Sequence, residues 1–182
     1  MEKRRIRILF TKRTRYQGVL NIVRFNPYFF ITALVAGLLI STAIWTFSGR
    51  LSILLGLCLV ALLYSLVVSL AVSHWIYDLS NIYKLPWVRD TPSDRESTWL
   101  NINAGFDEST PILRNHFPHA RLRAMDFYDP LKHTEASIAR ARAIYPQPEE
   151  TEKISYHSLP AADVSIDRII AMFSLHEIRD RG

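Results

Sequence analysis

The 182-residue chain has one cysteine, six glycines and, between Phe25 and Tyr77, no formally charged side chain except Arg50. A single cysteine, Cys58, excludes an intrachain disulfide and a zinc site built from cysteines. The chain also has no glycine-rich phosphate loop ending in Gly-Lys and no serine elbow of the GxSxG type. Its length permits one or two modest units and excludes a large multidomain enzyme.

Apolar residues are abundant and concentrated. Hydrophobic residues make up 49% of the chain and charged residues 21%, and the mean hydropathy is +0.06. Residues 28–47 and 51–77 form two apolar runs, and at ~1.5 Å per residue the first spans about 30 Å, one hydrocarbon thickness. We therefore predict an antiparallel transmembrane hairpin, since fewer than a hundred residues follow, too few to bury two apolar helices in a soluble protein.

Small residues recur along both predicted helices. Ala33, Gly37 and Ser41 are spaced by four in the first, and Ser52 and Gly56 by four in the second. Such spacing lets helix backbones approach closely in lipid. Small residues are also common in membrane helices without any packing role, so the sequence leaves both interpretations open.

Charge predicts the orientation of the hairpin. Eight basic residues and one acid precede the first helix, whereas the turn between the helices carries only Arg50. The positive-inside rule therefore places both termini in the cytoplasm. The eight basic residues are Lys3, Arg4, Arg5, Arg7, Lys12, Arg13, Arg15 and Arg24. Aromatic residues mark the same interface: Phe25, Tyr28, Phe29, Phe30, Trp75, Tyr77, Tyr83 and Trp87. We expect the partner to be the lipid bilayer with its anionic headgroups rather than nucleic acid, and the location to be a bacterial inner membrane.

The remaining composition predicts a separate α/β domain. The expected divisions are a basic N-terminus (1–26), the hairpin (27–77), a linker (78–97) and a domain (98–182). Within the domain we expect four strands, at residues 99–102, 121–126, 153–156 and 166–173, and helices at 109–117 and 132–144. The apolar run 169–173 is typical of a parallel strand buried on both faces. The pattern predicts a parallel sheet with right-handed crossovers.

Ligands of such sheets bind beyond the carboxyl ends of the strands. Gly105 follows the first strand, where glycine permits a tight turn and close approach of a ligand. Asp126 ends the second strand, where an acid commonly accepts hydrogen bonds from ribose hydroxyls, although the same residue could cap the next turn. His176 and Glu177 follow the fourth strand and could supply a general base, but a histidine there is more often structural; we assign no metal site.

Three ordered motifs resemble a known family. LNINAGFDES (residues 100–109), AMDFYDP (124–130) and SLPAADVSIDRIIAMFSLHEI (158–178) are similar to segments of class I S-adenosylmethionine-dependent methyltransferases of the small-molecule group. The resemblance implies a partial Rossmann-like methyltransferase domain, truncated after the fourth strand, with S-adenosylmethionine as cofactor. The implied cofactor-binding residues are Asn101, Asn103, Ala104, Gly105, Asp126, Phe127, Ser155 and Tyr156. The chain departs from the family pattern in having Asn101 and Ser155 at usually acidic positions, and Asn103 and Asp107 at two usual glycines.

Two functions follow from these features. The first is a membrane-anchored methyltransferase-like protein that transfers a methyl group to a small or lipophilic acceptor, chiefly by aligning it, with no catalytic residue assigned. The alternative is a non-catalytic membrane interaction or assembly protein with a degenerate nucleotide-binding half domain. In a half domain the strand that begins at Ile166 and ends at Phe173 would be an unpaired edge, so self-association through it is expected.

Overall fold

The computed structural model describes residues 13–88 and 97–178. The chain divides into two compact units, Arg15–Lys84 and a second that joins Met1–Thr14 to Leu85–Gly182. Most of the predicted basic N-terminus (1–12), the centre of the predicted linker (89–96) and residues 179–182 lie outside the described residues.

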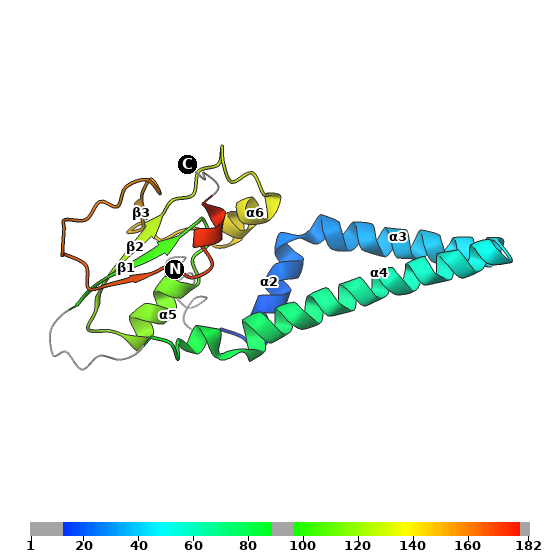
Figure 1. The fold of residues 1–182 in the computed structure, drawn as a ribbon, viewed down its shortest axis with the longest axis horizontal. Coiled ribbons are helices and arrows are strands. Elements are labelled where there is room, and N and C mark those ends of the chain that lie inside the picture. The colour runs from blue at the N-terminus through cyan, green and yellow to red at the C-terminus, as the bar shows by residue number, and fades with distance from the viewer. Residues whose placement is uncertain (1–12, 89–96, 179–182) are drawn as a thin grey trace, which may run out of the picture. The chain divides into compact units, whose positions relative to one another are not determined.

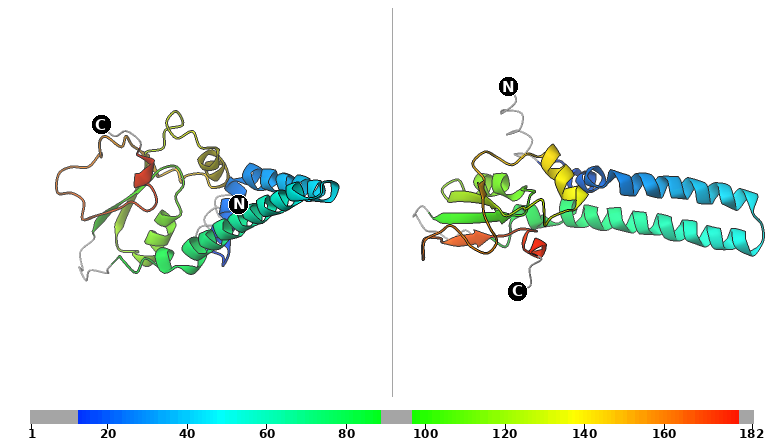
Figure 2. Two further views of the ribbon diagram at one scale, coloured as in Figure 1. Left: turned by 45° about the vertical axis from the view of Figure 1, so that its right-hand side comes forward. Right: turned by 90° about the horizontal axis from the view of Figure 1, so that it is seen from above.

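Two long apolar helices dominate the first unit. Helices α3 (Pro27–Thr46) and α4 (Arg50–His74) run antiparallel and side by side (Figures 1 and 2). Gly49, at a φ of +71°, lies in the short turn that joins them. Ala33 is the only buried residue of α3, and α4 has none. Both helices are long and apolar enough to cross a membrane, and their exposed apolar surface is unlike that of core helices in a soluble protein.

The two interpretations of the small residues can be compared at Gly37 and Gly56. A Cβ at Gly37 would lie 3.8 Å from Leu62 Cδ2 and 3.9 Å from Leu59 Cδ1, so Gly37 faces α4 closely. A Cβ at Gly56 would meet nothing within 4 Å. Gly56 is therefore not in close contact with α3, so close packing of small residues is seen at Gly37 and not at Gly56.

The first unit contains further elements that the sequence analysis did not predict. Helix α2 (Gln17–Phe25) precedes α3. The second apolar run does not continue as an α-helix to residue 77, because the chain after His74 forms a π-helical turn, η1 (Trp75–Leu79). A 3-10 turn, η2 (Asn81–Lys84), ends the unit.

The second unit is an α/β structure with a four-stranded parallel sheet (Figure 1). Its strands are β1 (Thr98–Asn103), β2 (Arg121–Asp126), β3 (Glu152–Lys153) and β4 (Arg168–Ile170). Their order is β3-β2-β1-β4, and every neighbouring pair is parallel. Helix α5 (Ser109–His116) connects β1 to β2, helix α6 (Ala136–Ile144) connects β2 to β3, and a 3-10 turn, η3 (Leu175–Glu177), follows β4.

Three elements are shorter than predicted. Helix α6 begins at residue 136 rather than 132, because Asp129 organises a turn: its Oδ1 accepts from Leu131 N at 2.9 Å and its carbonyl from His133 N at 2.8 Å. Strand β3 ends at Lys153, and an antiparallel bridge between Ser155 and Ser158 then reverses the chain. Strand β4 ends at Ile170, well before the predicted residue 173.

Strand β4 also differs from the buried strand that its apolar run predicted. Ile170 is buried, but Ile169 is 52% exposed. Among the strands described, β4 pairs with β1 alone and therefore forms one edge of the sheet. The apolar run is thus not buried on both faces within the described residues.

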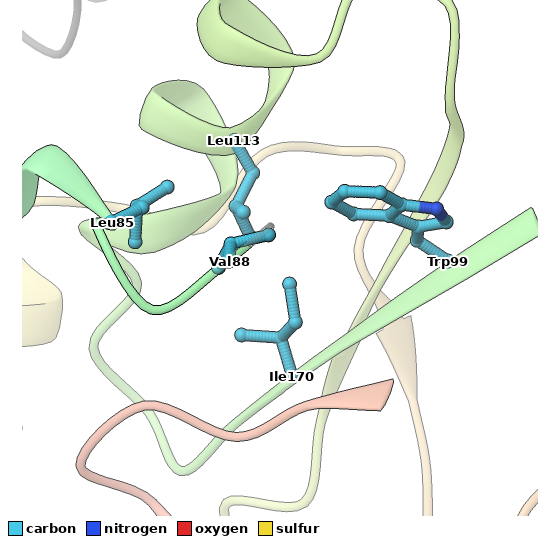
Figure 3. Close-up of a cluster of buried hydrophobic side chains, with 5 residues drawn as sticks. All are labelled: Leu85, Val88, Trp99, Leu113 and Ile170. Atoms are coloured by element: carbon cyan, nitrogen blue, oxygen red, sulfur yellow. The ribbon is translucent and has the colours of Figure 1, made fainter. Parts of the chain in front are cut away.

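Apolar side chains cover both faces of the sheet. On the face of α5 lie Leu85, Val88, Trp99, Leu113 and Ile170, with Leu113 and Ile170 approaching Val88 from opposite sides (Figure 3). Leu85 and Val88 belong to the segment predicted as linker, and their burial shows that this part packs in the core. On the other face lie Leu100, Ile102, Ala104, Met125 and Phe127. Trp99 and its neighbour Leu100 lie on opposite faces of the sheet, because successive side chains of a strand point to opposite faces.

Candidate functional site

The carboxyl ends of three strands bring polar residues to one edge of the sheet. In the parallel register, Asn103 of β1 lies opposite Asp126 of β2, which lies opposite Lys153 of β3. The loop that follows β1 contains Gly105, at a φ of +102°. The candidate site comprises these strand ends and the side chains that reach them from α6 and the loops.

Asn101 lies on β1 two residues before Asn103 and has no exposed surface. Its Nδ2 donates to Ser109 Oγ at 2.8 Å and Thr110 Oγ1 at 2.7 Å. Asp107 Oδ1 accepts from the backbone N–H groups of Ser109 and Thr110 at 3.0 and 2.9 Å, and so caps the first turn of α5. These two departures from the family pattern therefore form a buried network that fixes the loop to the start of α5.

Gly105 is closely surrounded by side chains of the same unit. A Cβ at this position would lie 2.8 Å from Tyr128 Cδ2 and 3.0 Å from Ile138 Cγ2. Its positive φ is a conformation that residues with a Cβ rarely adopt. The glycine is therefore required by the backbone and by its neighbours, and the space above it is filled by Tyr128 in this conformation.

Both carboxylate oxygens of Asp126 have partners. Its Oδ2 accepts from Arg142 Nη1 at 2.6 Å, and its Oδ1 accepts from the backbone N–H of Tyr128 at 3.0 Å. Arg142, from α6, also donates to the Gly105 carbonyl at 3.1 Å and places its guanidinium 4.3 Å from the centroid of the Tyr128 ring. The Asp126 side chain is only 3% exposed. Arg142 thus joins the two residues that the sequence analysis selected first, Gly105 and Asp126.

Asn103 and Gln147, at the same edge, each have a buried polar atom without a hydrogen-bond partner within the described chain. Asn103 Oδ1 accepts from Gln147 Nε2 at 3.1 Å, but Asn103 Nδ2 and Gln147 Oε1 are unsatisfied. A buried donor or acceptor without a partner costs ~1 to 3 kcal/mol. The pair therefore presents one donor and one acceptor that a polar ligand could satisfy.

The other predicted residues lie beside this edge rather than in it. Ala104 and Phe127 are buried in the core cluster opposite α5. Tyr156 packs against Phe127, with ring centroids 6.2 Å apart, and its hydroxyl accepts from Lys132 Nζ at 2.5 Å. Ser155 is exposed and forms the bridge that ends the β3 segment. Of the predicted site residues, Gly105 and Asp126 are linked through Arg142, and Asn103, which lies opposite Asp126 in the sheet, bonds to Gln147.

An ion pair attaches the short strand β3 to β2. Arg123 donates from Nε and Nη2 to the two carboxylate oxygens of Glu152, at 2.9 and 2.8 Å. These hydrogen bonds lower the pKa of the Glu152 carboxyl and raise the pKa of the Arg123 guanidinium. The pair holds Lys153, the neighbour of Glu152, at the site's edge.

The other titratable candidates do not converge. His176 Nε2 lies 3.1 Å from Glu177 Oε1, but the histidine side chain is 68% exposed. Within residues 13–88 and 97–178, no group of three or more histidine, cysteine, aspartate or glutamate side chains is arranged to hold a metal ion. The contact between His176 and Glu177 is therefore a surface pair after β4.

Three residues of the site were missed from the sequence: Tyr128, Arg142 and Gln147. Tyr128 lies two residues after Asp126, within the motif AMDFYDP, so its place beside the second strand end is visible in the sequence. Arg142 is one of two arginines in a nine-residue helix, and Gln147 lies in a proline-rich loop. Neither carries a sequence signal, because only the tertiary fold brings α6 and its following loop to the strand ends.

Comparison of the chain with models of known protein families, with curated proteins and with solved structures gave no match.

Proposed function

We propose that this protein is a membrane-anchored, S-adenosylmethionine-dependent methyltransferase-like protein acting on a small or lipophilic acceptor. In this proposal α3 and α4 form a transmembrane hairpin with both chain termini in the cytoplasm. The second unit is then the amino-terminal part of a Rossmann-like fold that binds the cofactor at the carboxyl ends of β1 and β2.

The single observation that carries the proposal is the placement of Gly105 and Asp126 in a sheet of order β3-β2-β1-β4. The strand order reverses between β1 and β4, and ligands of open parallel sheets bind beside such a reversal, beyond the carboxyl ends of the strands. A positive-φ glycine two residues after the first strand and a buried acid ending the second are features that favour an adenosine-containing cofactor there. The three motifs quoted above lead to the same cofactor.

The residues at this edge fit the cofactor after one rearrangement. Asp126 has the position to accept hydrogen bonds from ribose hydroxyls, but Arg142 occupies its Oδ2. Asn103 Nδ2 and Gln147 Oε1 have unused hydrogen-bonding capacity. Cofactor binding therefore requires the Arg142 guanidinium and the Tyr128 ring to move from Asp126 and Gly105.

S-adenosylmethionine, when bound, supplies an activated methyl group on its sulfonium sulfur. The protein's own contribution to methyl transfer is to hold the cofactor and orient the acceptor, because an in-line displacement depends on positioning. A membrane anchor would keep the second unit near acceptors that partition into the bilayer.

A specific observation also favours a second function, a non-catalytic membrane interaction or assembly protein. The chain's own Arg142 and Tyr128 take the carboxylate and the space that a nucleotide would use. Such contacts are expected where a nucleotide site has been lost and its residues have become structural. The two functions differ in whether the full chain binds the cofactor.

Isothermal titration of the full chain in detergent micelles with S-adenosylmethionine separates them. The proposal predicts saturable binding that Asp126→Ala weakens by ~1.5 to 3 kcal/mol, the scale of hydrogen bonds to a charged group. Asp163→Ala, which removes an exposed carboxylate of the same unit, is the matched control and should bind like the unaltered chain. Arg142→Ala should bind more tightly, because it frees Asp126 Oδ2. Absence of binding in the unaltered chain and in Arg142→Ala would favour the second function.

A further inference from the structure

Helix α2 lies at the ends of both long helices, within the same unit. Asn26 alone separates it from α3, which begins at Pro27. α2 also contacts α4 and η1, where the second long helix ends. Figure 1 shows that α2 runs across the direction of α3 and α4 rather than along it. If the long helices cross a bilayer, α2 therefore lies parallel to the membrane surface at the level where they leave it.

Asp78, from η1, holds the first turn of α2 in this position. Its Oδ1 accepts from the backbone N–H of Gly18 at 2.6 Å and its Oδ2 from that of Val19 at 3.0 Å. These N–H groups have no partner inside the helix, and the carboxylate charge is favourable at a helix N-terminus. His74 Nδ1 donates to Asp78 Oδ2 at 2.9 Å, and the Asp78 side chain is fully buried. We call Asp78, His74 and the two backbone groups the α2 clasp.

The clasp turns one face of α2 inward and leaves another exposed. Gly18, Asn21 and Phe25 are buried. Tyr16 and Leu20 are 49% and 54% exposed, and Arg24 continues the same line at a spacing of four, on one side of the helix. An exposed leucine and tyrosine flanked by arginines is a combination typical of helices that lie in a lipid headgroup layer.

We propose that α2 is an in-plane interfacial helix whose Tyr16–Leu20 side enters the boundary between acyl chains and headgroups of an anionic lipid layer. This inference rests on the proposed function, because it requires α3 and α4 to span the bilayer. Arg24 and Arg15, whose guanidinium lies 5.5 Å from the Tyr16 ring centroid, supply positive charge for lipid phosphates. The partner is the membrane itself, bound by a helix that the clasp fixes at headgroup depth.

Depth-dependent fluorescence quenching tests this inference in the full chain. Three single-cysteine proteins carry an environment-sensitive fluorophore in nanodiscs of phosphatidylcholine and phosphatidylglycerol. The first uses the native Cys58, near the middle of α4. The others carry Cys58→Ala with either Leu20→Cys or His119→Cys, both at exposed positions. Quenchers are placed near the headgroup, at the acyl-chain end, or in water as iodide.

The inference predicts that the label at position 20 is quenched chiefly by the shallow lipid quencher and is shielded from iodide. The label at Cys58 should respond to the deep quencher, and the label at position 119 to iodide alone. A position-20 label that is as open to iodide as position 119, with Cys58 still deep, would overturn the inference and leave the anchor intact. A Cys58 label open to iodide would overturn the anchor, and the inference with it.

A second variant tests the role of the clasp. Asp78→Ala removes the carboxylate that holds Gly18 and Val19, so the label at position 20 should become more accessible to iodide while the Cys58 label stays deep. Replacing phosphatidylglycerol by phosphatidylcholine should reduce the shielding of position 20, because the arginines lose their anionic partners. Shielding that is unchanged by both alterations would contradict a clasped helix held in an anionic headgroup layer.

Discussion

At the scale of the residue, Arg142 is the side chain that occupies the candidate site. Its guanidinium bonds to the Asp126 carboxylate and the Gly105 carbonyl and lies over the Tyr128 ring. A buried carboxylate that loses its cation is left with an uncompensated charge, which is more costly than losing both partners. We therefore expect the ion pair between Arg142 and Asp126 both to stabilise the second unit and to keep the Asp126 carboxylate from a ligand.

A double-mutant cycle tests this coupling. Arg142→Ala should lower the free energy of unfolding by ~1 to 3 kcal/mol, because the buried Asp126 carboxylate loses a charged hydrogen bond. In an Asp126→Asn background, which keeps an oxygen for the Tyr128 N–H but removes the charge, the same substitution should cost less than about 1 kcal/mol. Equal costs in both backgrounds, measured by chemical denaturation, would contradict the coupling.

The site could be predicted from the sequence only where local chemistry marks it. Gly105 and Asp126 follow strand patterns, and their positions are set by the ends of β1 and β2. The role of Arg142 could not be predicted, because its partner lies 16 residues away and is reached only when α6 has packed. Asn101 and Asp107 illustrate a different limit: the sequence identifies them as departures from a family pattern but does not reveal the buried network they form.

At the scale of the element, the ion pair between Arg123 and Glu152 stabilises the two-residue strand β3. Its hydrogen bonds lower the pKa of Glu152 below the ordinary value of 4.5. The stabilisation is therefore complete above that value and is lost as the pH falls through the lower pKa of the folded state. Because both side chains are partly exposed, the pair contributes less than about 1 kcal/mol.

Glu152→Gln should remove this pH dependence while lowering stability slightly at neutral pH. The measurement is the free energy of unfolding of the full chain at neutral pH and at successive values below pH 4.5. Asp163→Asn, at an exposed position in the same unit, is the control. If Glu152→Gln and the unaltered chain lose stability in parallel as the pH falls, the ion pair is not the cause.

The helix hairpin offers a matched pair of glycines. Gly37→Leu should destabilise the pairing of α3 and α4 by ~1 to 3 kcal/mol, because a Cβ there would already lie at contact distance from Leu59 and Leu62, and the further atoms of leucine must displace them. Gly56→Leu should have little effect, since a Cβ there meets nothing within 4 Å. Loss of helicity on titration from mild detergent into SDS measures both, and equal effects would show that Gly37 is not a packing position.

Element prediction succeeded where the local signal was strong. The observed bounds agree with the predicted ones within one or two residues for strands β1 and β2, helix α5 and the two long helices. The exception is the last part of the second apolar run. In these elements the hydrophobic periodicity and the turn residues were clear. Strands β3 and β4 are shorter than their apolar runs because turns at Ser155 and beyond Ile170 end the pairing. Helix α2 was missed because its basic neighbours indicated a charged tail, whereas its N-terminus is completed by Asp78, about sixty residues away.

At the scale of the whole molecule, the exposed side of β4 predicts self-association. Among the strands that the structure describes, β4 is an edge strand; Ile169 within it is 52% exposed, and Phe173, beyond its end, is 44% exposed. Exposed edge strands with apolar side chains pair readily with other chains, and a lysine on the edge suppresses such pairing. Ile169→Lys should therefore lower the average mass of the full chain measured by light scattering in micelles.

The control for this effect is Val164→Lys. Val164 is also an exposed apolar residue of the same unit, but it lies outside the strands. The edge interpretation predicts that Val164→Lys leaves the mass unchanged. A monodisperse monomer in the unaltered chain, or equal effects of the two substitutions, would contradict association through β4.

Hydrogen exchange of the full chain in nanodiscs, with and without S-adenosylmethionine, tests the proposed cofactor site most directly. We expect slower exchange at the backbone amides of residues 104–107 and 127–129, which follow β1 and β2 at the edge that contains Gly105 and Asp126. At a cofactor concentration that saturates the unaltered chain but not Asp126→Ala, exchange at the same amides should slow less in the variant. Exchange that is unaltered at saturating cofactor, or slowed only elsewhere in the chain, would contradict a cofactor site at these strand ends.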